Sequence, residues 1–123
     1  MFHRTIKYIC CVIILSLLTI QCHKKKKADE SIETGKSIYG ANCSACHGEH
    51  GEGDGPGAAA LNPKPRNYKK DGFQYGSSLE EVKRTINEGI EGTAMPSWAE
   101  VLTDEQITQV AEYVKSLAAS SVE

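Results

Sequence analysis

Long hydrophobic runs and an excess of basic residues are both missing from most of this 123-residue chain. The longest uninterrupted apolar-to-neutral run covers the thirteen residues 8–20, well below the roughly 20 residues that a helix needs to span a bilayer. Residues 28–123 contain 8 Lys and Arg against 16 Asp and Glu, a formal charge of −8. This charge argues against nucleic acid as a partner.

Cysteine is scarce after the N-terminal segment: of the five cysteines in the chain, only Cys43 and Cys46 follow that segment. Without a second cysteine pair, only His47 and His50 are left to complete a zinc site, and four ligands so close in sequence would strain the segment. A thioredoxin-like dithiol would need a βαβ pattern, which the sequence lacks. The pair therefore fits neither zinc nor dithiol chemistry well.

Residues 43–47 read Cys-Ser-Ala-Cys-His, the C-x-x-C-H pattern of c-type haem attachment. Two thiols separated by two residues can add to the two vinyl groups at one porphyrin edge, and His47 follows as the proximal iron ligand. We therefore predict one haem c (heme c), bound covalently through Cys43 and Cys46.

Residues 1–22 are typical of an export signal, because His3, Arg4 and Lys7 precede the apolar run. Export agrees with the haem motif, since c-type haem is joined to exported apoprotein. We expect the protein on the periplasmic side of a bacterial membrane.

The end of this signal offers a possible lipid attachment site at Cys22, which resembles the acylated cysteine of bacterial lipoproteins. Cleavage to a soluble protein and retention as a short anchor are the alternatives. Residues 23–30 form a lysine-rich linker, in which Lys24–Lys27 either strengthen binding to anionic headgroups or serve as a solvated spacer.

Three helices are predicted after the linker, and no segment alternates convincingly with the period of a strand. The first spans about Asp29 to Asn42 and leads into the cysteine motif. The second starts at a capping box of Ser77 or Ser78 with Glu80 or Glu81 and stops at Gly89. The third starts at a capping box of Thr103 and Gln106 and continues to about Ala118.

These features resemble a class I, mitochondrial-type monohaem cytochrome c domain. Gly35, Tyr39, the motif 43–48, Met95-Pro96 and Tyr113 carry the resemblance, and it covers about Ile32 to Leu117. The segment 51–68 is similar in particular to cytochromes of cbb3-type oxidase subunit III. The resemblance implies an all-α cytochrome c fold over residues 31–120, with three or more helices around one covalent haem, and a crossing of the terminal helices at Gly35.

Met95 is the predicted sixth ligand of the iron, by elimination. It is the only methionine after the leader, and His50 is too close to His47 to reach the opposite haem face. With both axial positions filled, the iron transfers one electron and binds no substrate, and the thioether raises its potential. A five-coordinate haem that binds gas or peroxide is the alternative.

The rest of the sequence contains no acid–base pair, nucleophile constellation or second metal site, so we predict an electron-transfer protein and no enzyme. Its expected partners are redox proteins, namely an oxidase, reductase or dehydrogenase, which it serves as a shuttle or as a subunit. Four of its basic residues fall in one short segment, which is either a docking patch or a solvated loop: Lys64, Arg66, Lys69 and Lys70.

Further haem contacts are assigned to residues between and after the two ligands. The resemblance implies that the carbonyl of Pro63 or Pro65 accepts the hydrogen of His47 Nδ1, and it leaves the choice open. Four side chains are candidates for the haem propionates, with plain packing as the alternative: Arg66, Tyr68, Tyr75 and Trp98.

Overall fold

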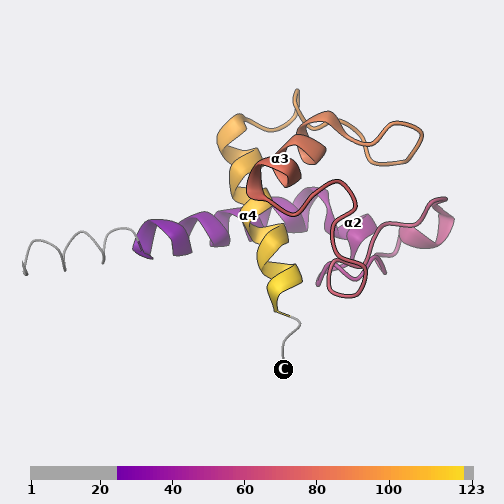
Figure 1. Cartoon of the computed structure of the whole chain (residues 1–123), viewed down its shortest axis with the longest axis horizontal. Helices are drawn as coiled ribbons and strands as arrows, with labels where there is room; N and C mark the ends of the chain where they lie inside the picture. The colour runs from indigo at the N-terminus through magenta and orange to yellow at the C-terminus, as the bar shows by residue number, and fades with distance from the viewer. Residues whose placement is uncertain (1–24, 121–123) are drawn as a thin grey trace, which may run out of the picture. The chain divides into compact units, whose positions relative to one another are not determined.

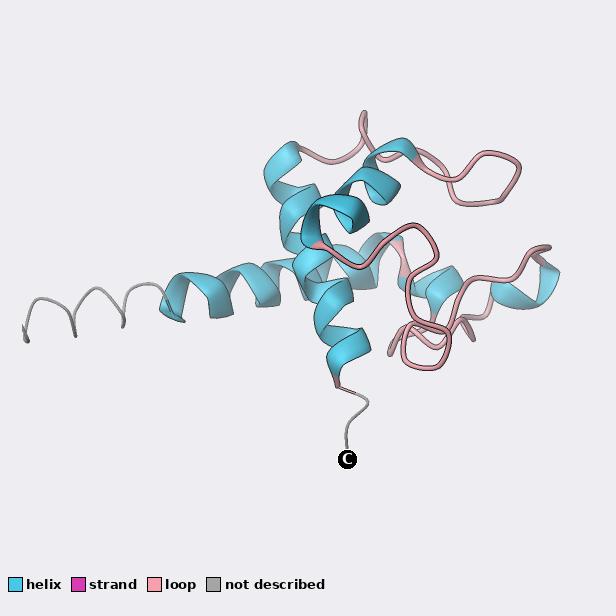
Figure 2. Cartoon of the chain, in the orientation of Figure 1, coloured by secondary structure: helices cyan, strands magenta, loops and turns pink. Residues whose placement is uncertain are grey.

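The computed structural model describes residues 25–120, and within that range it contains helices, turns and loops but no strand (Figures 1 and 2). Contacts divide the chain into two units, Met1–Glu30 and Ser31–Glu123. Cys22 and the predicted export signal lie outside the described residues. The all-α prediction is confirmed for the part of the chain that the structure describes.

The first helix occupies residues 25–42 of the described chain. We expected it to begin near Asp29, after a linker, but the helix already includes the lysines of residues 25–27. Lysine has a long unbranched side chain that loses little rotamer freedom in a helix, so the helix can extend beyond its apolar stripe. An apolar stripe marks the buried part of this helix and not the residue at which the helix begins.

Three further helices and one 3-10 turn follow: α2 Ser44–His47, η1 Ala58–Ala60, α3 Leu79–Glu88 and α4 Asp104–Ala119. Both predicted capping boxes are present. In α3 the Ser78 amide donates to Glu81 Oε2 at 3.0 Å, and in α4 the Thr103 amide donates to Gln106 Oε1 at 2.9 Å. Side chains thus satisfy the amides that each helix start leaves without a helical partner.

The first helix and α4 cross at Gly35, as predicted (Figure 1). A Cβ atom on Gly35 would lie 2.1 Å from the backbone oxygen of Gln109, so only glycine permits this approach. Tyr39 and Tyr113 meet edge to face beside the crossing, with ring centroids 5.4 Å apart. Ser31 Oγ donates to Glu112 Oε2 at 2.5 Å. These contacts hold the first helix against α4 at one side of the core.

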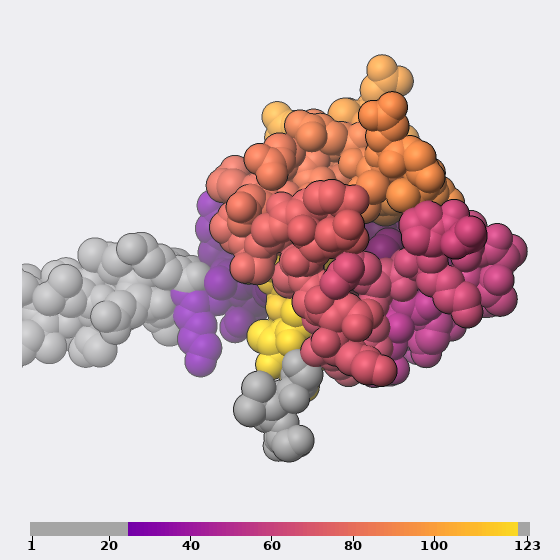
Figure 3. Space-filling model, turned by 45° about the vertical axis from the view of Figure 1, so that its right-hand side comes forward, coloured from indigo at the N-terminus to yellow at the C-terminus, as the bar shows by residue number. Residues whose placement is uncertain are grey.

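The core is formed mainly by α3 and α4. Its buried residues are Tyr39, Val82, Ile86, Leu102, Ile107, Val110, Ala111, Val114 and Leu117. Two long loop regions border it, residues 48–78 and 89–103. In the space-filling view the magenta segment near residue 60 and the orange segment near residue 95 border each other, with purple chain visible behind them (Figure 3). These loops carry the candidate site.

Candidate haem-binding site

The cysteine motif forms one helical turn, α2, placed directly after the first helix. The Cys43 amide donates to the Tyr39 carbonyl at 2.8 Å, and the His47 amide donates to the Cys43 carbonyl at 2.9 Å. Both cysteines are half-buried free thiols. Burial, and then the neighbouring Cys46, raise the pKa of the Cys43 thiol to about 11. The turn thus presents two thiols and an imidazole from five consecutive residues.

A cavity of about 390 Å³ is lined by these groups and by Met95. This volume is within the range of roughly 300–1,000 Å³ that is usual for cofactor sites. The walls from α3 and α4 are apolar and include Val82, Ile86, Val110 and Val114. One cavity therefore brings together every predicted attachment and ligand residue.

The residues around this cavity fit a haem. Trp98 lines the cavity, and its Nε1 is buried without a hydrogen-bond partner among the described residues. A buried donor without a partner is costly, and a haem carboxylate would supply the acceptor. The sequence placed Trp98 among the propionate candidates, and this unsatisfied donor agrees with that assignment.

His47 is half-buried, and burial lowers the pKa of its imidazole. Its Nδ1 lies 2.8 Å from Tyr68 Oη, and the two rings stack with centroids 5.3 Å apart. We expected a carbonyl of Pro63 or Pro65 at this nitrogen. Both prolines line the cavity, but the hydrogen bond is made by the tyrosine.

The backbone explains this difference, because the Tyr68 amide donates to the Gly51 carbonyl at 2.8 Å and so brings residue 68 beside the turn that follows His47. The carbonyl of Pro65 lies against Gly53, where a Cβ atom would approach it to 2.3 Å. Burial raises the pKa of Tyr68 far above its usual value, so the phenol keeps its proton. Tyr68 therefore contacts the ligand side chain itself.

Met95 is half-buried and belongs to a loop that is held at several points. Its carbonyl accepts from the Ile90 amide at 3.0 Å, and its amide donates to Thr93 Oγ1 at 3.1 Å. Gly89, at φ 71°, lets the Met95 loop approach the end of α3 closely: a Cβ on Gly89 would lie 2.6 Å from the carbonyl carbon of Pro96. The sequence identified Gly89 only as a helix stop.

Arg66 and Tyr75 also line the cavity. The Arg66 guanidinium donates to the carbonyls of Asp71 and Gly72 at 2.7 and 3.1 Å and to Gln74 Oε1 at 3.2 Å. These hydrogen bonds hold residues 66–74 together as a compact loop. Tyr75 is 45% exposed, so it lines the cavity and is also accessible to solvent.

The basic segment is only partly available for docking. Lys69 forms an ion pair with Glu52 at 3.2 Å, and Arg66 is engaged within its loop. Among the residues that the structure describes, Lys64 and Lys70 form no ion pair. Within this segment, therefore, only these two lysines carry a positive charge that is available to a partner.

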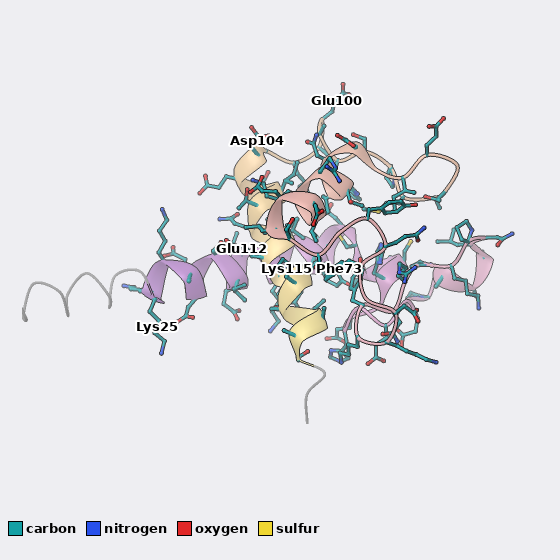
Figure 4. All side chains as sticks on the ribbon, viewed as in Figure 1. Lys25, Phe73, Glu100, Asp104, Glu112 and Lys115 are labelled. Carbon is teal, nitrogen blue, oxygen red and sulfur yellow. The ribbon has the colours of Figure 1, made fainter. Side chains whose placement is uncertain are left out.

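Sequence reasoning missed two contacts near the motif. Tyr39 Oη donates to the Gly48 carbonyl at 2.8 Å, and Phe73, labelled in Figure 4, stacks on Tyr68 with centroids 5.5 Å apart. The hydroxyl of Tyr39 could have indicated this contact, because a buried tyrosine usually has a hydrogen-bond partner for its hydroxyl. The Phe73 contact depends on how the loop folds.

No helix among residues 25–120 is both long enough and apolar enough to cross a bilayer.

Comparison with known proteins connects this site to haem proteins. Residues 30–114 match the family model described as cytochrome C oxidase, cbb3-type, subunit III. The cbb3-type cytochrome c oxidase subunit CcoP of Azospirillum brasilense is 31% identical over 98 residues, which cover 80% of this chain and 32% of that protein. The chain thus spans about a third of the length of this oxidase subunit.

Two other matches differ in size and setting. Cytochrome c6 of Cladophora glomerata is 34% identical over 96 residues, covering 75% of this chain and 94% of that protein. A chain of the Kuenenia stuttgartiensis reducing HAO-like protein complex superposes with a TM-score of 0.67 at 35% identity, over 72% of this chain and 44% of that one. The similarity therefore includes a short relative of comparable length as well as parts of longer chains.

Proposed function

Because the chain belongs to the cbb3-type cytochrome c oxidase subunit III family and is a class I monohaem cytochrome c domain, we propose that it transfers single electrons through one covalently bound haem c. Bound haem supplies an iron that cycles between Fe(II) and Fe(III). The observation that supports the proposal is the single cavity lined by Cys43, Cys46, His47 and Met95.

The proposed roles of the side chains follow from their chemistry. Cys43 and Cys46 would hold the haem by thioether bonds, and His47 and Met95 would be the axial ligands. Trp98 Nε1, buried without a partner, would donate to a propionate, while Arg66 and Tyr75 line the same cavity. Two protein ligands leave no position on the iron for a substrate, so the domain carries electrons and performs no catalysis by itself.

The proposed location is the periplasmic side of a bacterial membrane, reached through the export signal of residues 1–22. Lipid on Cys22 would tether the cytochrome domain of residues 31–120 through the lysine-rich segment 23–30. Relatives named as oxidase subunits and as part of a HAO-like complex support redox proteins as partners. The accessible Lys64 and Lys70 at the loop between the cysteine motif and α3 would favour an acidic partner surface.

Haem extraction tests the attachment. Denatured holoprotein should retain its haem in acid–acetone, because thioether bonds survive denaturation. Cys43→Ala or Cys46→Ala should lower the yield of holoprotein, whereas His50→Ala, a change at an exposed histidine close to the motif, should leave it unchanged. Free extraction of haem from the unmutated protein would refute covalent attachment.

A further inference from the structure

The contact between His47 and Tyr68 lies directly behind the proposed iron ligand. Tyr68 Oη is 2.8 Å from His47 Nδ1, and the rings stack with 16° between their planes. Phe73 in turn stacks on Tyr68 at 24°. His47 therefore ends a stack of three rings, and its polar contact within that stack is a phenol oxygen.

Several independent contacts hold Tyr68 in this place. Its amide donates to the Gly51 carbonyl at 2.8 Å, and its ring lies so close to Gly51 that a Cβ there would be 2.6 Å from Tyr68 Cδ2. The next two amides, of Lys69 and Lys70, donate to Asn67 Oδ1 at 3.0 and 2.9 Å. The turn that carries Tyr68 is thus fixed on both sides of the residue.

The protons can be assigned from the chemistry of imidazole. A neutral imidazole that gives the lone pair of Nε2 to a metal carries its proton on Nδ1. Nδ1 then donates, and Tyr68 Oη accepts. A phenol oxygen can also donate, so the same contact accommodates the other tautomer, in which Tyr68 donates to Nδ1.

We propose that Tyr68 is the positioning residue of His47: its hydroxyl accepts the hydrogen bond of Nδ1–H when Nε2 binds the haem iron, in place of a proline carbonyl. This inference rests on the proposed ligation by His47. The hydrogen bond draws Nδ1–H toward the phenol and makes the imidazole a stronger electron donor, which favours Fe(III). Removing the acceptor therefore raises the reduction potential.

The test compares two tyrosine variants of the holoprotein. Tyr68→Phe keeps the ring and its stacking and removes only the hydroxyl. Tyr113→Phe removes a hydroxyl from a ring that packs on Tyr39 and does not line the cavity. Only Tyr68→Phe should raise the midpoint potential and accelerate deuterium exchange of His47 Nδ1–H, measured by nitrogen-15 NMR of the reduced protein. A purely structural role would change stability but neither readout.

Unchanged potential and exchange in Tyr68→Phe would overturn the proposal and indicate another acceptor, such as the carbonyl of Pro63 or Pro65. If that variant fails to accumulate, the unmutated reduced protein decides: a nuclear Overhauser effect between His47 Nδ1–H and the Tyr68 ring protons is expected, and its absence overturns the proposal. Covalent haem without this effect refutes only the role of Tyr68, whereas absence of covalent haem refutes the proposed function as well.

Discussion

The two sides of the cavity hold their proposed ligands in different ways. His47 ends the helical turn α2, and its backbone is bonded to Cys43 four residues earlier. Met95 lies in a loop that is attached to the end of α3: the Trp98 amide donates to the Ile86 carbonyl at 3.2 Å, and Ser97 Oγ donates to the Asn87 carbonyl at 2.6 Å. The histidine side is built locally, and the methionine side depends on a separate helix.

This difference indicates where each side is vulnerable. Changes to the α3 end should move Met95 and leave Cys43, Cys46 and His47 in place. Changes to the loop around Gly51 and Tyr68 should act on His47 and leave Met95 in place. Four experiments would separate or refine the two sides.

The largest effect is expected for Met95→Ala. Loss of the thioether should lower the reduction potential, abolish the weak near-infrared sulfur-to-ferric-iron absorption and open the iron to CO. CO binding to nearly all of the reduced variant, against almost none of the unmutated protein, is the measurement. An unchanged spectrum in the variant would show that another group is the sixth ligand, and CO binding to the unmutated protein would favour a five-coordinate haem.

Gly89→Ala tests the attachment of the methionine loop to α3. Gly92→Ala is the matched control, because Gly92 also has a positive φ, 76°, but its Cβ position is open. Strain in the left-handed region should cost the control about 1 kcal/mol. The backbone of Gly89, at φ 71° and ψ −166°, lies in a region nearly restricted to glycine, and this strain together with displacement of the Met95–Ser97 backbone should bring the cost for Gly89→Ala to about 3 kcal/mol. Denaturant unfolding of both holoproteins measures this, and equal losses would contradict the close approach.

Gly51→Ala makes the corresponding test on the histidine side. Its Cβ would lie 2.6 Å from Cδ2 of the Tyr68 ring and displace that ring, whereas a Cβ at Gly72, φ 63°, would have no neighbour within 4 Å. We expect a loss of about 2 kcal/mol for Gly51→Ala and about 1 kcal/mol for Gly72→Ala. The near-infrared absorption of the Met95 ligand should survive both changes. Its loss in Gly51→Ala would show that the two sides are coupled.

The smallest effect concerns the capping boxes. Hydrogen bonds from the Ser78 side chain and backbone lower the pKa of Glu81 in the folded state. The stability that these bonds confer is therefore present above the unfolded pKa and is lost as pH falls through the folded one. Glu81→Gln should lower Tm near pH 6, and should lower it less at an acid pH below the ordinary Glu pKa of about 4.3, where the carboxyl of the unmutated protein becomes protonated. Gln106→Ala in α4 should lower Tm equally at both pH values, and a parallel loss for Glu81→Gln would contradict this linkage.

Much of the fold was predictable because its signals are local. The capping boxes, the stop at Gly89 and the apolar stripe of α4 each lie within a few residues, and the comparisons confirm the predicted cytochrome c fold. The close crossing at Gly35 was also foreseen, since a glycine inside a helix needs a packing reason. The C-x-x-C-H motif is equally local, because five consecutive residues are enough to predict haem attachment.

The contacts of the long loop could not be predicted in the same way. Tyr68 was a candidate for the propionates, with plain packing as the alternative, and the resemblance implied a proline carbonyl at His47; the structure places Tyr68 Oη at His47 Nδ1. Arg66 was a candidate for propionate contact or partner docking, with packing or a solvated loop as the alternatives, and its guanidinium donates to two carbonyls of its own loop. The position of Tyr68 depends on its backbone hydrogen bond to Gly51, in a distant part of the loop, and the Arg66 contacts depend on how residues 66–74 turn back toward the guanidinium. No local pattern encodes them.

The crossing at Gly35 joins the two ends of the domain, and this determines the order in which the molecule can assemble. The first helix, which leads into the cysteine motif, is separated by a long stretch of chain from its packing partner α4. Before α4 packs, the chain has the complete motif but lacks most of the apolar wall around it. For the proposed haem attachment, both thiols would be accessible until α4 packs against the first helix, and a contact between segments so far apart in sequence slows folding.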